Sequence, residues 1–226
     1  MKYLEKTFKE RCKKQLSPYG FKPYRNNFYR VINDVFQSLS LHQSISGREC
    51  TVEFCAFPLC CGERISKSCC GHFHLKSFEN SYAWFEFDRD DLASIDNCID
   101  SMFDYIEKYL IPFFESADTA GNAYRAYHDY GFPDLDYVMF CMTVKESWYN
   151  KGIDHLLAMK NQIETAYQRN IECFGDDLGE DYHMRIKDDL DAIQYKIEML
   201  SQPNKQYIEN FILQNERLAL ANLGMK

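Results

Sequence analysis

A strictly alternating segment near the N-terminus constrains the fold more than any other part of the chain. From Val35 to Ile45, apolar side chains and two glutamines occupy one set of alternate positions, and a phenylalanine, three serines and a histidine occupy the other. A period of two predicts a β-strand with one buried face and one wetter face. Short turns at 33–34 and 46–48 connect this segment to strand-like segments at 26–33 and 49–59. Three consecutive strands joined by short turns predict an antiparallel sheet.

Two amphipathic helices flank the predicted strands. Residues 1–18 carry an apolar side chain at every fourth position, and residues 91–111 carry a longer apolar stripe. The aspartates at 88–91 are typical of a helix N-terminus, and Pro112 is expected to end or kink the second helix. We therefore predict an α+β fold, with an antiparallel four- to five-stranded sheet packed with two helices and followed by an all-helical C-terminal region.

The domain organisation follows from a change of pattern after residue 116. Strand-like segments at 72–78 and 82–87 precede the change, and helical stripes separated by short turns follow it. One such turn is predicted at 150–152, Asn-Lys-Gly. We predict an α+β domain over 1–116 and a helical region over 117–226, which could pack on the same core.

Composition and charge restrict the class of protein. The chain of 226 residues has a formal net charge of −8, which disfavours binding to nucleic acid or to an anionic membrane surface. It has no apolar run near the roughly 20 residues of a membrane span, and its start does not resemble a secretory signal. Its ten cysteines are therefore expected to be reduced thiols in the cytoplasm.

Residues 16–114 contain an ordered set of short motifs. Leu16 closes a helix and is followed by Gly20-Phe21-Lys22, and a Leu-Ile-Pro-Phe-Phe run at 110–114 closes the segment. Between these motifs the ordered set also contains Phe28, Arg30, Val35, Gln37, Leu41 and Gln43. In this N-terminal half the chain resembles a bacterial family known as domain of unknown function 4304. The resemblance implies a small cytoplasmic bacterial α+β domain, and it transfers no catalytic residue.

A cysteine- and histidine-rich stretch between 60 and 74 is the first candidate site. Four thiols and two imidazoles could supply a tetrahedral zinc site. The candidate ligands are Cys60, Cys61, Cys69, Cys70, His72 and His74. Neither cysteine pair has the spacing of a familiar zinc module, and adjacent side chains in an extended chain point to opposite faces. The alternative is that the cysteines are small buried hydrophobes and the histidines lie on a wet face.

The wetter face of the central strand is the second candidate site. Its small hydroxyl groups and a histidine, beside aromatic residues of 82–84, could line a groove for a ligand or partner. This predicted binding surface consists of Ser38, Ser40, His42, Tyr82 and Trp84. The alternative is a polar face covered by the C-terminal helices. A thiol–imidazole pair of Cys55 and His42 is a third option, which depends on strand register.

The sequence contains no GxSxG, HExxH or P-loop motif. We therefore predict a non-catalytic binding or protein-interaction module with a protein partner and without a cofactor. The alternative function is a metal-binding protein or metal-dependent enzyme centred on the segment from Cys60 to His74, in which zinc would be the metal.

Overall fold

The computed structural model describes residues 2–68, 73–79, 81, 84–132 and 136–225. The chain divides into two compact units, and each is described by itself. The first unit comprises Met1–Pro133 together with Asn215–Lys226, and the second comprises Asp134–Gln214. The first unit contains the sheet, and the second is built from helices.

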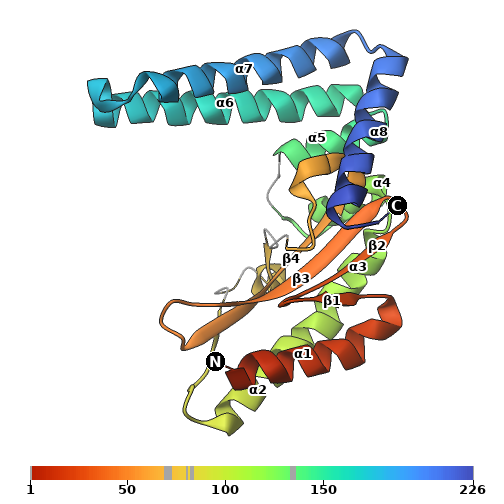
Figure 1. Cartoon of the computed structure of the whole chain (residues 1–226), viewed down its shortest axis with the longest axis vertical. Coiled ribbons are helices and arrows are strands. Elements are labelled where there is room, and N and C mark those ends of the chain that lie inside the picture. Colours follow the sequence, from red (N-terminus) through yellow and green to blue (C-terminus); the bar gives the residue numbers. More distant parts are fainter. Residues whose placement is uncertain (1, 69–72, 80, 82–83, 133–135, 226) are drawn as a thin grey trace. The chain divides into compact units, whose positions relative to one another are not determined.

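The sheet of the first unit is antiparallel and has six strands in the order β1-β2-β3-β4-β5, with β6 also paired to β4. Figure 1 labels β1 to β4 of this sheet. The strands are β1 Lys22–Tyr24, β2 Asn27–Ile32, β3 Val35–Gln43, β4 Glu49–Pro58, β5 Phe73–His74 and β6 Phe85–Glu86. The predicted α+β class and the antiparallel meander are confirmed. The sheet has more strands than expected because β1 forms a separate short edge strand.

The first unit also contains the α-helices α1 Lys2–Leu16, α2 Leu92–Tyr105, α3 Ile111–Ser116 and α4 Ala120–Asp129. The buried residues of α1 are Leu4, Phe8, Cys12 and Leu16, which is the predicted stripe. Pro112 does not end the second helix. A π-helical turn, Ile106–Leu110, joins α2 to α3, and Pro112 occupies the first turn of α3, where a proline is well tolerated.

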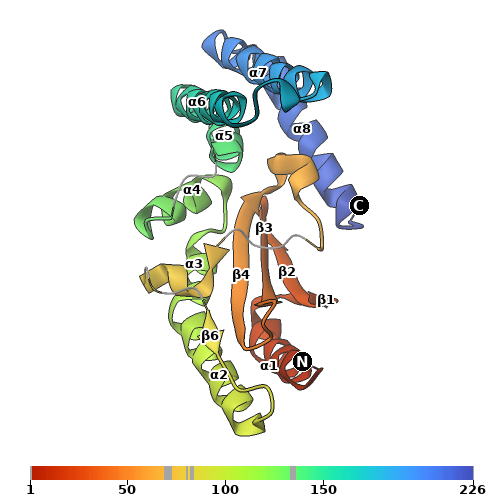
Figure 2. The same ribbon diagram turned by 90° about the vertical axis from the view of Figure 1, so that its left-hand side faces the viewer.

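The core of the first unit is rich in aromatic rings. Phe54 of β4 makes an edge contact with Phe113 of α3, with ring centroids 5.5 Å apart. Phe8 of α1 lies 5.6 Å from Phe103 of α2. Figures 1 and 2 show α1 and α2 side by side, with α2 and α3 running along the strands. Ring contacts of this kind add to the stability given by buried area, so they fix how the helices lie on the sheet.

A buried polar network connects the sheet to the end of α3. Gln37 donates hydrogen bonds to the carbonyls of Phe114 (2.6 Å) and Ala117 (2.9 Å) and accepts one from Arg30 Nε (2.7 Å). Arg30 also donates to the carbonyl of Tyr19 at 2.6 Å. Burial lowers the pKa of the Arg30 guanidinium, although nearby carboxylates oppose this effect. The network thus satisfies carbonyl groups at the end of α3 that the helix itself leaves unpaired.

The division of the chain differs from the expected boundary at residue 116. Helix α4 belongs to the first unit, where Tyr127 is buried and its hydroxyl accepts a hydrogen bond from Ala56 N at 2.8 Å. The chain from Asn215 onward also belongs there, and Asn222 Nδ2 donates to the carbonyl of Ile65 at 3.2 Å. Such contacts between distant segments have no signal in local sequence patterns.

The second unit contains α5 Asp136–Lys145, α6 Tyr149–Phe174, α7 Glu180–Ser201 and the first part of α8 Lys205–Asn222. The turn predicted at 150–152 is wrong, because these residues lie inside α6 and the chain turns at 146–148, where Ser147 has a φ of 59°. Gly152 instead allows close packing: a Cβ at this position would lie 2.8 Å from Thr143 Oγ1. The glycine is therefore a packing residue of α6.

Candidate functional site

One face of the sheet gathers polar side chains from three segments. Strand register pairs His42 with Thr51 and Glu53 with His74, and side chains alternate between faces along each strand. These four residues therefore lie on the same face. The ring of Trp84 lies above them, with its centroid 5.6 Å from that of His42 and 6.0 Å from that of His74. The face thus combines imidazoles, a carboxylate, a hydroxyl and an indole.

Two buried polar atoms on this face are unpaired. Neither Thr51 Oγ1 nor His74 Nδ1 has a hydrogen-bond partner among the residues that the structure describes. Thr51 is fully buried, whereas the His42 side chain is half exposed and lies 3.7 Å from Glu53, measured from Nδ1 to Oε1. Buried polar groups in folded proteins are normally hydrogen-bonded. These two atoms are buried, so the exposed polar groups of this face are those of His42 and Glu53.

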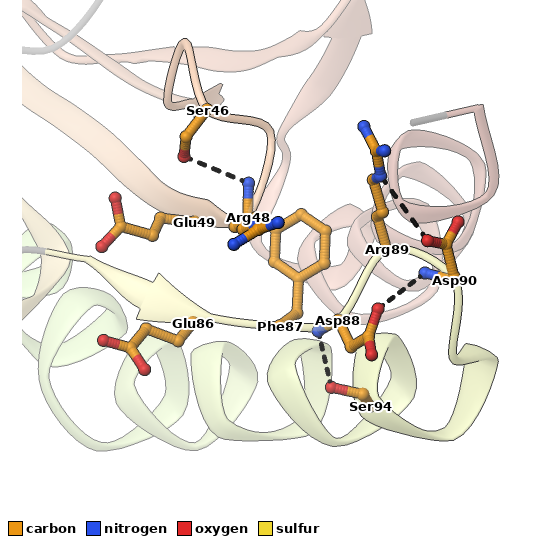
Figure 3. Close-up of a pocket in the computed structure, with 9 residues that line it drawn as sticks. All are labelled: Ser46, Arg48, Glu49, Glu86, Phe87, Asp88, Arg89, Asp90 and Ser94. Carbon is orange, nitrogen blue, oxygen red and sulfur yellow. Dashed lines mark hydrogen bonds and ion pairs between the residues drawn. The ribbon is translucent and has the colours of Figure 1, made fainter.

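Two further carboxylates extend the same face toward the end of the sheet. Glu49 and Glu86 are direct cross-strand partners in the pairing of β4 with β6, and Glu49 shares its face with Thr51 and Glu53. Figure 3 shows both carboxylates pointing the same way at the mouth of a pocket of about 910 Å³. We call the whole surface the acidic sheet face, which comprises His42, Glu49, Thr51, Glu53, His74, Trp84 and Glu86.

The cross-strand pair of glutamates is electrostatically unfavourable. Like charges placed directly opposite one another destabilise an antiparallel pair of strands. Within the described ranges Glu86 makes no ion pair, and the only ion-pair partner of Glu53 is the half-exposed His42. The chain also carries a net charge of −8. Arg48 and Arg89 also line the pocket, but the carboxylates of Glu49, Glu86, Asp88 and Asp90 outnumber them, so the net charge there is negative and attracts positively charged groups.

The loop beside this face positions α2. Asp91 is the N-cap of the helix, and its side chain accepts a hydrogen bond from Ala93 N at 2.9 Å. Asp88 Oδ1 accepts from Asp90 N at 3.0 Å, and Ser94 Oγ accepts from Asp88 N at 2.9 Å (Figure 3). These bonds confirm the predicted capping role of the aspartates. These hydrogen bonds thus fix the conformation of the loop that forms one wall of the pocket.

The structure brings together part of the predicted binding surface. His42 and Trp84 are in contact, as the prediction requires. Ser38 and Ser40 are buried, so the prediction that they line an open groove is wrong. The Ser38 hydroxyl lies 3.2 Å from Cys55 Sγ, because register places these residues opposite each other. Tyr82 lies outside the described residues.

The predicted metal ligands are only partly described. Cys60 and Cys61 are buried in the 3-10 helix Leu59–Arg64, and His74 lies in β5. Cys69, Cys70 and His72 lie outside the described residues. Over 2–68, 73–79, 81, 84–132 and 136–225, no three histidine, cysteine, aspartate or glutamate side chains are grouped to hold a metal. The zinc hypothesis therefore stays a prediction.

The thiol–imidazole pair of Cys55 and His42 is not formed. His42 is opposite Thr51, which is four positions from Cys55 along β4. At roughly 3.3 Å per residue, this places the two side chains about 13 Å apart. A nucleophile and its base must be within hydrogen-bond reach, so these residues cannot act together.

Comparison with known proteins found no matching family model, no matching curated protein and no matching solved structure. The resemblance of residues 16–114 to domain of unknown function 4304 therefore stays a prediction.

The sequence reasoning missed the carboxylates of the acidic sheet face. A signal was present, because Glu49, Thr51 and Glu53 occupy alternate positions of a strand whose other positions are apolar. That pattern predicts a polar face on β4. The pairing of Glu49 with Glu86 had no such signal, since it depends on how a two-residue strand docks against β4.

Proposed function

We propose that this protein is a non-catalytic binding protein that recognises a positively charged, extended peptide segment of a partner protein through its acidic sheet face. The observation that carries the proposal is the cross-strand pair of Glu49 and Glu86 next to Glu53 and Trp84. A bound lysine or arginine would relieve the repulsion between the two carboxylates. An arginine or lysine could also stack on the exposed part of the indole ring.

The spacing of the acidic groups supports an extended peptide. Glu49 and Glu53 are four residues apart on one strand, which corresponds to about 13 Å at roughly 3.3 Å per residue. An extended peptide repeats its side chains with the same period of two. Basic side chains at alternate positions of such a peptide would therefore face successive polar groups of β4. The half-exposed His42 imidazole would hydrogen-bond to its polar atoms.

Recognition would occur through side chains rather than by addition of a strand. The outer edge of β4 already pairs with β6 at Glu49 and Cys50 and with β5 at Glu53 and Phe54. A peptide that adds a strand needs a free edge. The pocket lined by Glu49 of β4 and Glu86 of β6 leaves room for a side chain of the peptide (Figure 3).

The charge of the chain supports this class of partner. A net charge of −8 steers cationic partners and repels nucleic acid and anionic lipid surfaces. In the part of the chain that the structure describes, no helix has the length and apolar character needed to cross a membrane. We also propose a bacterial origin and a cytoplasmic location, which the ten cysteines and the resemblance to domain of unknown function 4304 support.

The test is an isothermal calorimetric titration of the protein with a hexapeptide of alternating arginine and serine at low salt. The double variant Glu49→Gln/Glu86→Gln removes two charges from the acidic sheet face. The matched control, Asp188→Asn/Asp189→Asn, removes two charges from an exposed part of α7. We expect the glutamate variant to bind roughly tenfold more weakly, which is the effect of losing one to two close charge contacts, and the control to bind normally.

Two outcomes would contradict the proposal. One is that the arginine peptide binds no better than a matching peptide of glutamate and serine. The other is that both double variants weaken binding equally, because that result would assign the effect to net charge rather than to the acidic sheet face.

A further inference from the structure

Two cysteines from different elements meet in the first unit. Cys50 of β4 and Cys98 of α2 place their sulfur atoms 3.5 Å apart, and Met102 Sδ lies 3.8 Å from Cys50 Sγ. Cys50 is fully buried, and Cys98 is 5% exposed. The two thiols are thus adjacent in space although they are far apart in the sequence.

The two thiols differ in their access to solvent. Cys98 lines a surface pocket of about 430 Å³, together with Lys76, Phe85 and polar side chains from the start of α2. The Lys76 ammonium is held there by a hydrogen bond of 2.8 Å to the carbonyl of Trp84 and lies 4.2 Å from the centre of the Phe85 ring. A small solute entering this pocket reaches Cys98, and Cys50 lies behind it.

The two thiols also differ in acidity. The hydrogen bond from Cys50 lowers the pKa of the Cys98 thiol, and the charge of Lys76 lowers it further against the effect of burial. The same hydrogen bond, together with burial, raises the pKa of Cys50. Burial alone raises the pKa of Cys12, which is the ordinary behaviour of a cysteine in a core. The thiolate is the reactive form of cysteine, so Cys98 is favoured as the nucleophile and Cys50 as its resolving partner.

We propose that Cys98 and Cys50 form a modification site at which a small hydroperoxide converts the two thiols into a disulfide. The Cys98 thiol first releases its proton, and the thiolate attacks one oxygen of hydrogen peroxide. An S–O bond forms, the O–O bond breaks, and the departing hydroxide combines with the released proton to become water. Cys50 sulfur then attacks Cys98 sulfur. The S–S bond forms, the S–O bond breaks, and the second hydroxide leaves as water with the Cys50 proton. The two sulfurs lose two electrons, and peroxide is reduced to two water molecules.

The geometry suits this chemistry. A disulfide needs the sulfurs to close from 3.5 Å to about 2.05 Å. Side-chain rotation can supply this movement, because in the described part of the chain the only further hydrogen-bond partner of either sulfur is the soft thioether of Met102. The low exposure of Cys98 favours a peroxide over a bulky disulfide reagent. Glu86 of the acidic sheet face also lines this pocket, but the thiol chemistry requires no bound peptide.

The test treats reduced full-length protein with hydrogen peroxide, blocks the remaining thiols with N-ethylmaleimide under denaturing conditions, and maps the tryptic peptides by mass spectrometry. The peptide spanning 90–108 contains a single cysteine, Cys98. We expect it to be joined to the peptide spanning 49–64, which carries Cys50 together with Cys55, Cys60 and Cys61, so the Cys50→Ala variant assigns the link to Cys50. Dithiothreitol should release the link.

Variants separate the two roles. In Cys50→Ala the link should disappear and Cys98 should stop at the sulfenic acid, which dimedone traps. In Cys98→Ala, Cys50 should stay reduced, and the control Cys12→Ala should form the link at the normal rate. Lys76→Gln should slow oxidation several-fold, since a tenfold change in the ratio of thiolate to thiol accompanies each unit of pKa.

Two results would overturn the proposal. In the first, Cys50 and Cys98 are both recovered as alkylated thiols after a treatment that oxidises the exposed Cys173. In the second, the link from the 90–108 peptide persists in Cys50→Ala, which would show that another thiol reacts with Cys98. The trapping of a sulfenic acid at Cys98 also keeps the test decisive if the disulfide itself strains the fold.

Discussion

Replacement of Gln37 by leucine tests whether the buried polar network determines the stability of the first unit. The Gln37 amide makes hydrogen bonds of 2.6 and 2.9 Å to the carbonyls of Phe114 and Ala117 and accepts one of 2.7 Å from Arg30. Leucine has nearly the same size but can make none of these bonds. It therefore leaves the Ala117 carbonyl and the Arg30 Nε–H without these bonds in the interior.

The size of the effect follows from these three bonds. A buried hydrogen bond contributes about 1 kcal/mol net, a bond to a charged group contributes about 1.5–3 kcal/mol, and an orphaned buried group adds its own desolvation cost. Burial of the leucine side chain returns part of this loss, about 1–2 kcal/mol. We therefore expect Gln37→Leu to lower the free energy of unfolding by about 3 kcal/mol.

Gln43→Leu is the matched control, because Gln43 lies on the same strand and the same face. Its Nε2 atom is buried and has no hydrogen-bond partner among the residues that the structure describes. The same substitution there removes an unpaired polar group, so we expect no loss of stability, or a gain of up to about 1 kcal/mol.

Urea denaturation measures both variants in a Trp148→Phe background. Trp84 is then the sole tryptophan, and it reports on the first unit. Equal effects of the two substitutions would refute the reasoning, because the account assigns the whole difference to the hydrogen bonds of Gln37. A change in the slope of the urea dependence would indicate that the compactness of the native or unfolded state had changed instead.

Two further predictions concern other parts of the molecule. The hydrogen bond to Glu79 raises the pKa of Tyr105 from 10.0 to about 12. The contribution of this bond to the stability of the fold is therefore complete below pH 10 and is lost as the pH rises to about 12. An absorbance titration should show one fewer late-ionising tyrosine in Tyr105→Phe, and an unchanged titration would contradict the assignment. Gly152→Ala should destabilise the second unit, because the new Cβ would lie 2.8 Å from Thr143 Oγ1; a gain of about 1 kcal/mol from helix propensity would instead mean that α6 has room there.

Helices and strands were predictable where the spacing of apolar residues within one element reflects its buried face. The stripe of α1 and the alternation of β3 both predicted real elements, because a helix or strand with one buried face needs that spacing. The aspartate cap of α2 was also predictable from local chemistry.

Features that depend on tertiary contacts were not predictable in this way. Ser38 and Ser40 fit a wet face by pattern, but the structure buries both faces of β3 over 35–40. Gly152 resembles a turn residue, yet its lack of a side chain serves packing inside α6. In each case the deciding neighbour lies on another element of the chain.

The candidate site shows the same division. The polar positions of β4 could be read from alternation, whereas the Glu49–Glu86 pair and the Cys50–Cys98 contact join residues that are distant in the sequence. The pairing of β4 with β6 brings the two glutamates together, and the packing of α2 against β4 brings the two cysteines together. A single sequence shows which residue types are present, but it does not show which of them come into contact in the fold.

The most direct measurement of the central claim is a nitrogen-15 NMR spectrum of the labelled full-length protein during titration with the alternating arginine–serine hexapeptide. The proposed binding mode predicts saturable shifts of the Trp84 indole signal and of the backbone amides of Thr51, Glu53 and Glu86. In Glu49→Gln/Glu86→Gln the same shifts should need a roughly tenfold higher peptide concentration. Shifts confined to α6 and α7, or an unperturbed Trp84 signal at saturating peptide, would contradict the assignment of the acidic sheet face as the binding surface.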